Sequence, residues 1–214
     1  MSESTDIDPK GQNLEGFLED LASAKPAPGG GSAAAVAGGL AAALSSMVAN
    51  LTVGKDKYSD VEDQHREILE EAEKLRRGFL KAIREDIDAY NAVMDCYKLP
   101  KETEEQKKDR SRAIQTALKG AVEPPFKMAE MALDVLRLSK ECAETGNSHA
   151  VTDAGASAIL AEASLKTALL NVDINLSSIS DKDFVKENRD KRKRLTENAR
   201  EEAEDVVQLV NKKL

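Results

Sequence analysis

Apolar residues recur at intervals of three and four along most of the chain, which predicts a protein built from α-helices. Proline and glycine clusters such as "KPAPGGGS", "KLPKE" and "ETGNS" separate these runs. Such clusters end helices, because proline lacks an amide hydrogen and glycine readily adopts turn conformations. The expected helices cover about 14–24, 32–54, 61–97, 111–143, 150–176 and 181–214, with a bend or break at "EPPF" in the fourth.

The second expected helix carries no charge between Lys25 and Lys55. Its large apolar residues step by four, four, three and four along one side: Val36, Leu40, Leu44, Met47 (with Val48) and Leu51. Its other sides carry alanine, glycine and serine. A lipid-facing helix would be bulky all round, and a linker would show no stripe. The pattern therefore predicts a buried, closely packed helix, with Ser32 as its N-cap.

Composition supports a single all-α domain over residues 1–214, with 1–12 as a disordered tail. Alanine, leucine, glutamate and lysine dominate, and aromatic residues make up only 3%. We expect a helical bundle of long antiparallel helices with two Ala/Gly-rich helices at its centre. Since those two helices are poor in charge on every side, they need cover from elsewhere, which points to a homodimer.

Charge and cysteine usage narrow the function classes. The net charge of −8 argues against general nucleic-acid binding, and the polar N-terminus is unlike a signal peptide. Cys96 and Cys142 lie far apart with no Cys/His spacing typical of zinc, so no metal site is expected. We expect a cytoplasmic protein that binds neither membrane nor nucleic acid.

The long third helix places an acid on its apolar side. Its stripe passes through Phe79 and Ile83, and the next position before Tyr90 is Asp86. Asp88 is about 200° further round the helix and should point elsewhere. An unpaired buried carboxylate is costly and has a raised pKa. Asp86 is therefore either a structural partner of a basic side chain or a group that serves a reaction or a ligand.

Other polar residues also allow both a structural interpretation and a ligand-binding one. Asp153 suits a helix's first turn through the helix dipole, but it is also a candidate ligand contact. Asn171 and Asn175 lie one turn apart and either face a polar ligand or bridge helices. The "PGGGS" turn offers backbone amides at a helix start, and Lys55 and Lys57 at the other end of that helix could meet carboxylates.

Several motifs in a fixed order resemble a known family. They are "APGGGSAAAVAGGLAAALSSMV", "GKDKY", "DIDAYNAVMDCYKLPKETEEQ", "GN....TD" and "NVDIN". Together they are similar to the formiminotetrahydrofolate cyclodeaminase / methenyltetrahydrofolate cyclohydrolase family. The resemblance covers the chain from about residue 14 to the last helix. It implies an all-α, dimeric domain that binds tetrahydrofolate derivatives and needs no further cofactor.

The resemblance also implies roles for particular residues. The family's catalytic aspartate corresponds to Asp86, the position that the helical stripe singles out. The substrate-binding residues that carry over are Gly29, Gly30, Gly31, Ser32, Lys55, Lys57, Asn147, Asp153, Asn171 and Asn175. Thr152 stands where the family has serine, and Asp56 interrupts a basic run, which puts tight binding of a polyglutamate tail in doubt.

The function expected from these residues is hydrolysis of 5,10-methenyltetrahydrofolate to 10-formyltetrahydrofolate. The alternative is cyclisation of 5-formiminotetrahydrofolate with release of ammonia, which needs the same acid–base group. A second alternative, from a different class, is a non-catalytic folate-binding helical subunit. An acid on an apolar helix side, as at Asp86, argues against that alternative.

Overall fold

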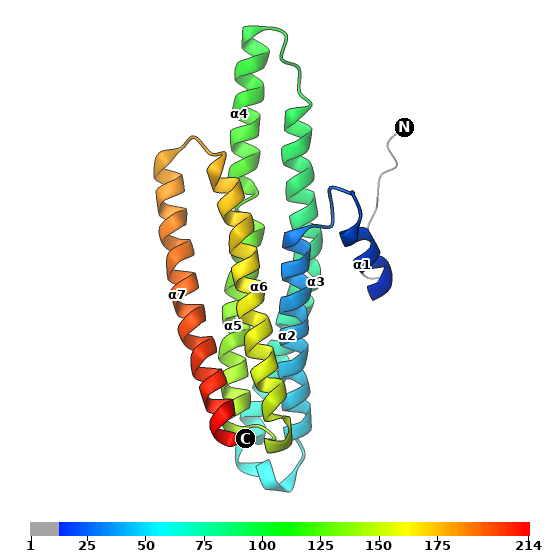
Figure 1. The fold of residues 1–214 in the computed structure, drawn as a ribbon, viewed down its shortest axis with the longest axis vertical. Coiled ribbons are helices and arrows are strands. Elements are labelled where there is room, and N and C mark those ends of the chain that lie inside the picture. Colours follow the sequence, from blue (N-terminus) through cyan, green and yellow to red (C-terminus); the bar gives the residue numbers. More distant parts are fainter. Residues whose placement is uncertain (1–12) are drawn as a thin grey trace.

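The computed structural model describes residues 13–214, most of which form an elongated bundle of helices (Figure 1). The elements are α1 (Leu14–Ala22), α2 (Gly30–Thr52), η1 (Asp56–Val61), α3 (Glu62–Tyr97), α4 (Glu104–Gly120), α5 (Glu123–Thr145), η2 (Ser148–Ala150), α6 (Val151–Ser177) and α7 (Lys182–Lys213). The described residues contain no strand, so the all-α expectation is confirmed. The expected tail, 1–12, lies outside the described residues.

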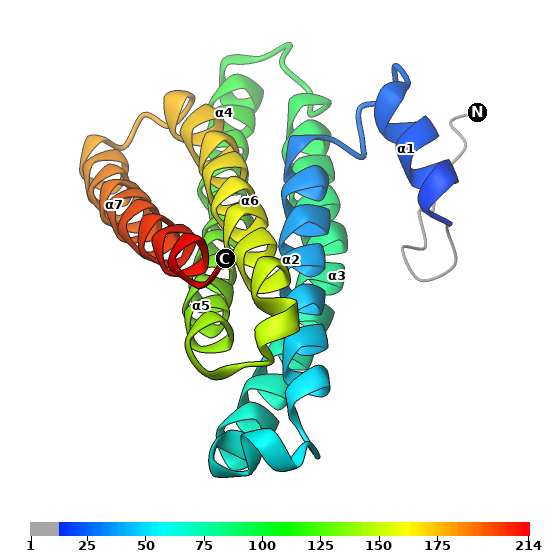
Figure 2. The same ribbon diagram turned by 60° about the horizontal axis from the view of Figure 1, so that its bottom comes forward.

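The first helix, α1, lies apart from the others. It has no buried residue, and both views place it beside α3 and outside the bundle (Figures 1 and 2). It ends at Ala22, two residues before the expected end at Ala24. The segment that follows leads through Pro26 and Pro28 into the start of α2.

Helix α2 packs through its small residues. Its fully buried apolar positions are Ala34, Ala35, Ala41, Ala42, Val48 and Ala49. At Gly38 a Cβ atom would lie 2.3 Å from the Phe79 ring, so only glycine lets α3 approach this closely. The close packing that the sequence predicts is confirmed. The large residues are not covered in the same way, because Leu40, Met47 and Leu51 are exposed.

Buried serines join α6 to α2. The Ser157 hydroxyl donates to the Ala41 carbonyl at 2.7 Å, and the Ser164 hydroxyl donates to the Ala34 carbonyl at 2.7 Å. The Ser45 and Ser157 hydroxyls are 2.9 Å apart. Because the Ser157 and Ser164 hydroxyls reach backbone carbonyls of the neighbouring helix, these buried polar groups are satisfied where the two helices pack closely. The contacts hold the α2–α6 pair in one register.

Two helix starts differ from the expectations, whereas the break expected at "EPPF" is confirmed. The chain at 104–145 forms two helices separated at 121–122, and "PP" occupies the first turn of α5, where proline is tolerated. The first of these starts at Glu104 rather than near Ser111, since Thr103 and Gln106 form a capping box. Ser32 does not cap α2: Gly29 is the N-cap, and Ser32 is fully buried within the first turn.

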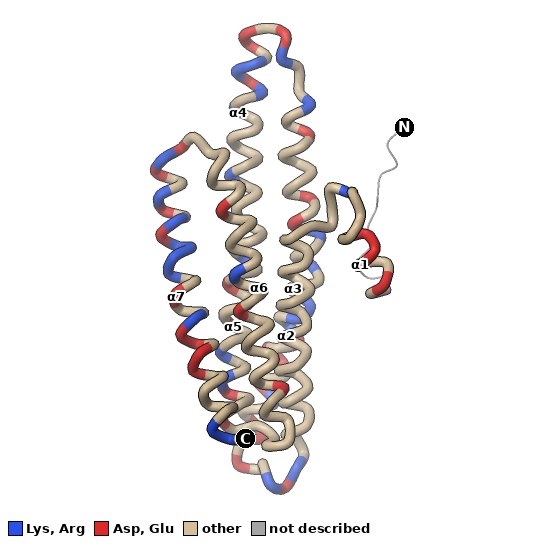
Figure 3. Tube along the Cα trace, viewed as in Figure 1, with Lys and Arg blue, Asp and Glu red and all other residues tan. Residues whose placement is uncertain are grey.

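Charge is distributed unevenly over the bundle. Helix α7 carries many lysines, arginines and acids, whereas α2 carries none (Figure 3). Gly30–Thr52 is long and apolar enough to cross a membrane by length and composition. Of its most apolar window, however, 56% is buried inside the protein, a pattern shared with the core helices of soluble proteins.

Candidate functional site

A cavity of about 340 Å³ lies where α2 begins, below the hairpin that connects α3 to α4 (Figure 1). This volume is within the range of small-molecule sites. Its lining residues come from four regions of the chain: Pro26, Ala27, Gly29, Gly30, Gly31, Asp86, Ile87, Ala89, Tyr90, Val93, Ala121, Asn171, Ile174 and Asn175. Asp86 is the only charged residue in this lining.

The stripe of α3 carries Asp86 into the cavity. Phe79 and Ile83 lie on the same side of α3 as Asp86 and are buried in the core. Asp86, about one turn further along, lines the cavity beside the start of α2. A Cβ atom on Gly31 would lie 2.3–2.5 Å from the Asp86 carboxyl atoms, so the carboxyl group rests directly on the backbone of the first turn of α2. Asp88 is exposed, as the helical geometry predicts.

The environment of Asp86 favours its neutral form. Burial raises the pKa of Asp86 from its ordinary value of 3.8 to about 6. No hydrogen bond or ion pair to this carboxyl group is found among residues 13–214. Since a structural aspartate would have a basic partner, the geometry does not support the structural reading. The group is poised to take up and release a proton near neutral pH.

Two asparagines of α6 line the opposite wall. The Asn171 amide nitrogen donates to the Thr167 carbonyl at 3.0 Å, and the Asn175 amide nitrogen donates to the Ala121 carbonyl at 2.9 Å. Both side-chain nitrogens are therefore held by backbone, and both side-chain oxygens remain as acceptors. Gly30 faces Asn171, whose amide would lie 3.6 Å from an added Cβ. This wall suits a ligand with N–H donors.

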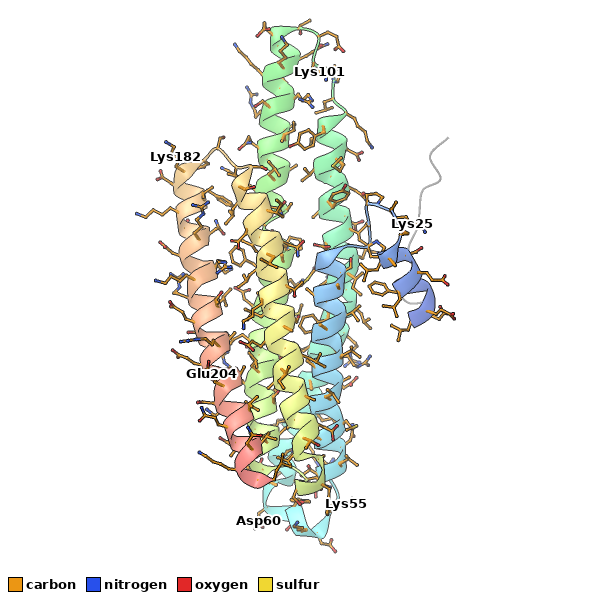
Figure 4. The ribbon with its side chains drawn as sticks, in the orientation of Figure 1. Lys25, Lys55, Asp60, Lys101, Lys182 and Glu204 are labelled. Carbon is orange, nitrogen blue, oxygen red and sulfur yellow. The ribbon has the colours of Figure 1, made fainter. Side chains whose placement is uncertain are left out.

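The structure separates the other predicted residues from this cavity. Lys55, Lys57, Asn147 and Asp153 lie beyond the C-terminal end of α2 or near the start of α6. Helix α2 has 23 residues, so about 33 Å separates its two ends. Figure 4 shows Lys55 at the lower end of the bundle and Lys25 well above it, beside the start of α2. One chain therefore does not bring the two groups together.

At that lower end the polar groups bond one another. The Asn147 amide nitrogen donates to the Leu51 carbonyl at 2.8 Å, and its backbone amide donates to the Thr52 hydroxyl at 2.9 Å. The Ser148 backbone amide donates to the Tyr58 hydroxyl at 3.0 Å. Hydrogen bonds from Ser148, together with nearby Lys57, lower the pKa of Tyr58 to about 8. Asn147 thus fastens the end of α2 to the turn before α6.

Some lining residues were not singled out by sequence reasoning. Tyr90 and Val93 continue the α3 stripe, so the signal that located Asp86 also contains them. Ile174 lies between the two asparagines on α6, and the same helical spacing could have found it. Ala121 comes from the break between α4 and α5, for which no local pattern exists. Ser32, in contrast, was predicted at the site but does not line the cavity.

Within 13–214, no group of three or more histidine, cysteine, aspartate or glutamate side chains is arranged to hold a metal ion. Cys96 and Cys142 are both free thiols. The polar groups of the described cavity lining are one carboxyl group, the Tyr90 phenol, two amides and backbone groups.

Comparison with known proteins gives one consistent family. The formiminotransferase-cyclodeaminase family model matches residues 13–194. The methenyltetrahydrofolate cyclohydrolase of Methylorubrum extorquens is 44% identical over 176 residues, covering 82% of this chain and 85% of that protein. The formimidoyltransferase-cyclodeaminase of Mus musculus is 30% identical over 91% of this chain, which spans only 36% of that protein.

A solved structure agrees with the sequence relatives. The crystal structure of formiminotetrahydrofolate cyclodeaminase from Thermotoga maritima matches with a TM-score of 0.79 and 32% identity, covering 96% of each chain. The family match extends over most of the chain and includes the residues that line the cavity. This chain therefore belongs to the formiminotransferase-cyclodeaminase family.

Proposed function

We propose that this protein hydrolyses 5,10-methenyltetrahydrofolate to 10-formyltetrahydrofolate, with Asp86 as the acid–base group. One observation carries the proposal: an unpaired carboxyl group, with its pKa raised to about 6, lies in a cavity on the glycine backbone of α2. The cyclohydrolase name of the 44% identical relative supports this choice of reaction.

The substrate's reacting carbon suits such a group. It lies between N5 and N10 of the folate in a cationic amidinium. An ionised Asp86 beside it would stabilise the positive charge, and the partial burial of this carboxyl group would strengthen that attraction. The glycine turn at Gly30 and Gly31 presents backbone without side chains, so a flat ring can lie close to it.

The reaction needs one proton carrier. Asp86 takes a proton from water as the water oxygen bonds to the bridging carbon, which gives a neutral carbon bearing a hydroxyl group between N5 and N10. The C–N5 bond then breaks, N5 receives the proton held by Asp86, and the hydroxyl proton leaves to solvent as the formyl C=O forms. One proton is released overall, and a carboxyl group with a pKa of about 6 serves both steps.

The asparagines orient the ring. With their nitrogens held by backbone carbonyls, Asn171 and Asn175 offer oxygen acceptors to the N–H groups of the amino-pyrimidinone ring. Asp153 was expected to share this role, but it lies in the first turn of α6, at the opposite end of that helix from the two asparagines. Asn175 takes its place in this proposal.

The test is an assay of the purified protein with methenyltetrahydrofolate, followed by loss of the methenyl absorbance. Asp86→Asn should retain the fold and reduce turnover about 10²–10⁴-fold, the usual contribution of a general acid–base group. Asp88→Asn is the matched control, because Asp88 lies on the same helix and is exposed. Its turnover should equal that of the wild type. Undiminished turnover of Asp86→Asn would exclude this residue.

The second candidate is formiminotetrahydrofolate cyclodeamination, which the name of the Thermotoga maritima structure favours. The same cavity would serve, with N10 attacking the formimino carbon where water attacks otherwise, and ammonia leaving after protonation by Asp86. Ammonia release from 5-formiminotetrahydrofolate, measured beside the hydrolysis assay, distinguishes the two. Ammonia release without methenyl hydrolysis would replace the first proposal by the second.

A further inference from the structure

Tyr90 lies beside Asp86 in the cavity wall. The two residues are four positions apart on α3, and both line the cavity. Side chains four residues apart on a helix are neighbours, with their Cβ atoms about 5–6 Å apart. Aromatic side chains on a helix also lean toward its N-terminus, which for Tyr90 is the direction of Asp86. The phenol and the carboxyl group therefore belong to the same part of the cavity.

The Tyr90 hydroxyl is not used by the fold. Among residues 13–214 it has no hydrogen-bond partner, whereas the amide nitrogens of Asn171 and Asn175 are both held by backbone carbonyls. Tyr90 lines the cavity and is also 39% exposed, so it borders both the cavity and bulk water. A phenol both donates and accepts hydrogen bonds. Tyr90 can thus connect a group inside the cavity to solvent.

Hydrolysis of the methenyl group produces a proton that Asp86 does not carry. The attacking water brings two protons, and Asp86 takes the first and returns it to N5 as the C–N5 bond breaks. The second proton remains on the hydroxyl group of the tetrahedral intermediate and leaves as the formyl C=O forms. Since Asp86 is the proton donor in that step, a second group has to accept the hydroxyl proton.

We propose that the Tyr90 phenol is this second group and passes the hydroxyl proton of the tetrahedral intermediate to solvent. The step rests on the proposed function. The phenol oxygen accepts the proton from the intermediate as its own O–H proton moves to a water molecule outside the cavity. The electron pair of the broken O–H bond becomes the second bond of the formyl C=O, and the C–N5 pair goes to N5, which takes the proton from Asp86. Tyr90 ends the step as a neutral phenol, so no further reactant is needed.

Cyclodeamination should not depend on the Tyr90 hydroxyl. In that reaction N10 attacks the formimino carbon, and no hydroxyl group forms on it. Asp86 moves the N10 proton to the leaving amine, which accounts for the proton transfer inside the cavity. Removal of the Tyr90 hydroxyl should therefore reduce hydrolysis and leave the rate of ammonia release unchanged.

Tyr90→Phe tests the proposal, because it removes the hydroxyl and keeps the ring. Its kcat for methenyl hydrolysis should fall about 10²-fold, the lower limit for a general acid–base group, with KM unchanged. Tyr97→Phe is the matched control, since Tyr97 lies on the same helix, is 44% exposed and does not line the cavity. Its kcat should equal that of the wild type. A wild-type kcat in Tyr90→Phe would overturn the proposal, whether or not KM rises.

The pH dependence of kcat/KM separates a role of Tyr90 itself from a disturbance of Asp86. The pKa of Asp86 is raised to about 6, and Asp86 has to be ionised to accept a proton from water. The value of kcat/KM should therefore rise with pH through about 6 in the wild type and in Tyr90→Phe alike, at a lower level in the variant. A rise at a different pH in Tyr90→Phe would mean that the substitution acts through Asp86, and the proposed step would be rejected.

The wild-type assay distinguishes a failure of this step from a failure of the proposed function. If the wild type hydrolyses methenyltetrahydrofolate and Tyr90→Phe does so equally well, only the Tyr90 step is rejected. If the wild type does not hydrolyse it, the proposed function and this step are rejected together. Where the wild type also releases ammonia from 5-formiminotetrahydrofolate, an equal loss of both reactions in Tyr90→Phe would overturn the proposal, because cyclisation forms no hydroxyl group.

Discussion

The two ends of α2 treat their polar groups in opposite ways. At the lower end Asn147 and Thr52 hydrogen bond each other, and Tyr58 and Ser148 do the same. At the upper end Asp86 is pressed against glycine backbone, and among the described residues it has no hydrogen-bond partner. The hydrogen bonds at the lower end stabilise the fold, whereas the unpaired carboxyl group at the upper end destabilises it.

This difference separates stability from activity. A satisfied network contributes free energy of folding, so substitutions there should lower stability and leave turnover unchanged. A buried carboxyl group without a partner opposes folding, so its removal should raise stability and abolish turnover. The predictions below use single substitutions to test whether the lower end contributes stability and the upper end contributes activity.

Among the predictions that follow, the largest effect is expected at Gly31. Gly31→Ala adds a Cβ atom 2.3–2.5 Å from the Asp86 carboxyl atoms, so the acid must move away from its place in the cavity. A misplacement of about 1 Å can cost about 100-fold in turnover, which is the decrease expected in the methenyl assay. Gly39→Ala is the control, because its Cβ would lie at an ordinary 3.7 Å from Phe79. Equal turnover for both variants would contradict the geometry.

A substitution at the lower end of α2 should reduce the stability of the fold. The Thr52 hydroxyl is buried, donates to the Val48 carbonyl at 2.8 Å and accepts from the Asn147 amide at 2.9 Å. Thr52→Val keeps the shape but leaves that amide without an acceptor, so the free energy of unfolding should fall by about 2 kcal/mol. Urea denaturation measures this.

Two comparisons make that measurement specific. Thr167→Val removes a hydroxyl that bonds only the carbonyl one turn back, on an exposed part of α6, and should change stability by no more than about 0.5 kcal/mol. The turnover of folded Thr52→Val should match that of the wild type. A loss of turnover without a loss of stability would assign the lower end a role that its own hydrogen bonds do not explain.

The sequence predicted the upper end because its signals are local. Asp86 follows from the three-and-four spacing within one helix, and the pair Asn171 and Asn175 follows from one turn of another. The helix boundaries followed from proline, glycine and capping residues to within a few positions. The late start expected for the helix at Glu104 shows the limit, since the capping box at Thr103 was overlooked.

Other features depend on how helices pack. Periodicity divides α2 into a small side and a large side, but it does not say which side the chain covers; packing against Phe79 covers the small one. Likewise, the motifs containing Lys55 and Asp153 accompany the others along the sequence, and only the direction of α2, which is about 33 Å long, places them away from Asp86. The order of motifs along the sequence does not reveal how far apart they lie in the folded chain.

The smallest expected effect is the pH dependence of the stability difference between Asp86→Asn and the wild type. The folded-state pKa of Asp86 is raised from 3.8 to about 6, so the folded protein binds more protons than the unfolded chain between these values. The favourable contribution of the protonated group is complete below about pH 4 and is lost as pH rises through about 6. Asp86→Asn, which cannot ionise, should therefore be more stable than wild type near neutral pH.

Because Asp86 is partly exposed, the gain should be on the order of 1–2 kcal/mol near pH 7.5, and it should vanish below about pH 4. Urea denaturation of both proteins across this range gives the curve, with Asp88→Asn as the exposed control. A stability gain that is independent of pH would mean that the amide improves packing rather than removing a buried charge. A loss of stability near neutral pH would show that the carboxylate is held by a favourable partner, and that the upper end is structural like the lower one.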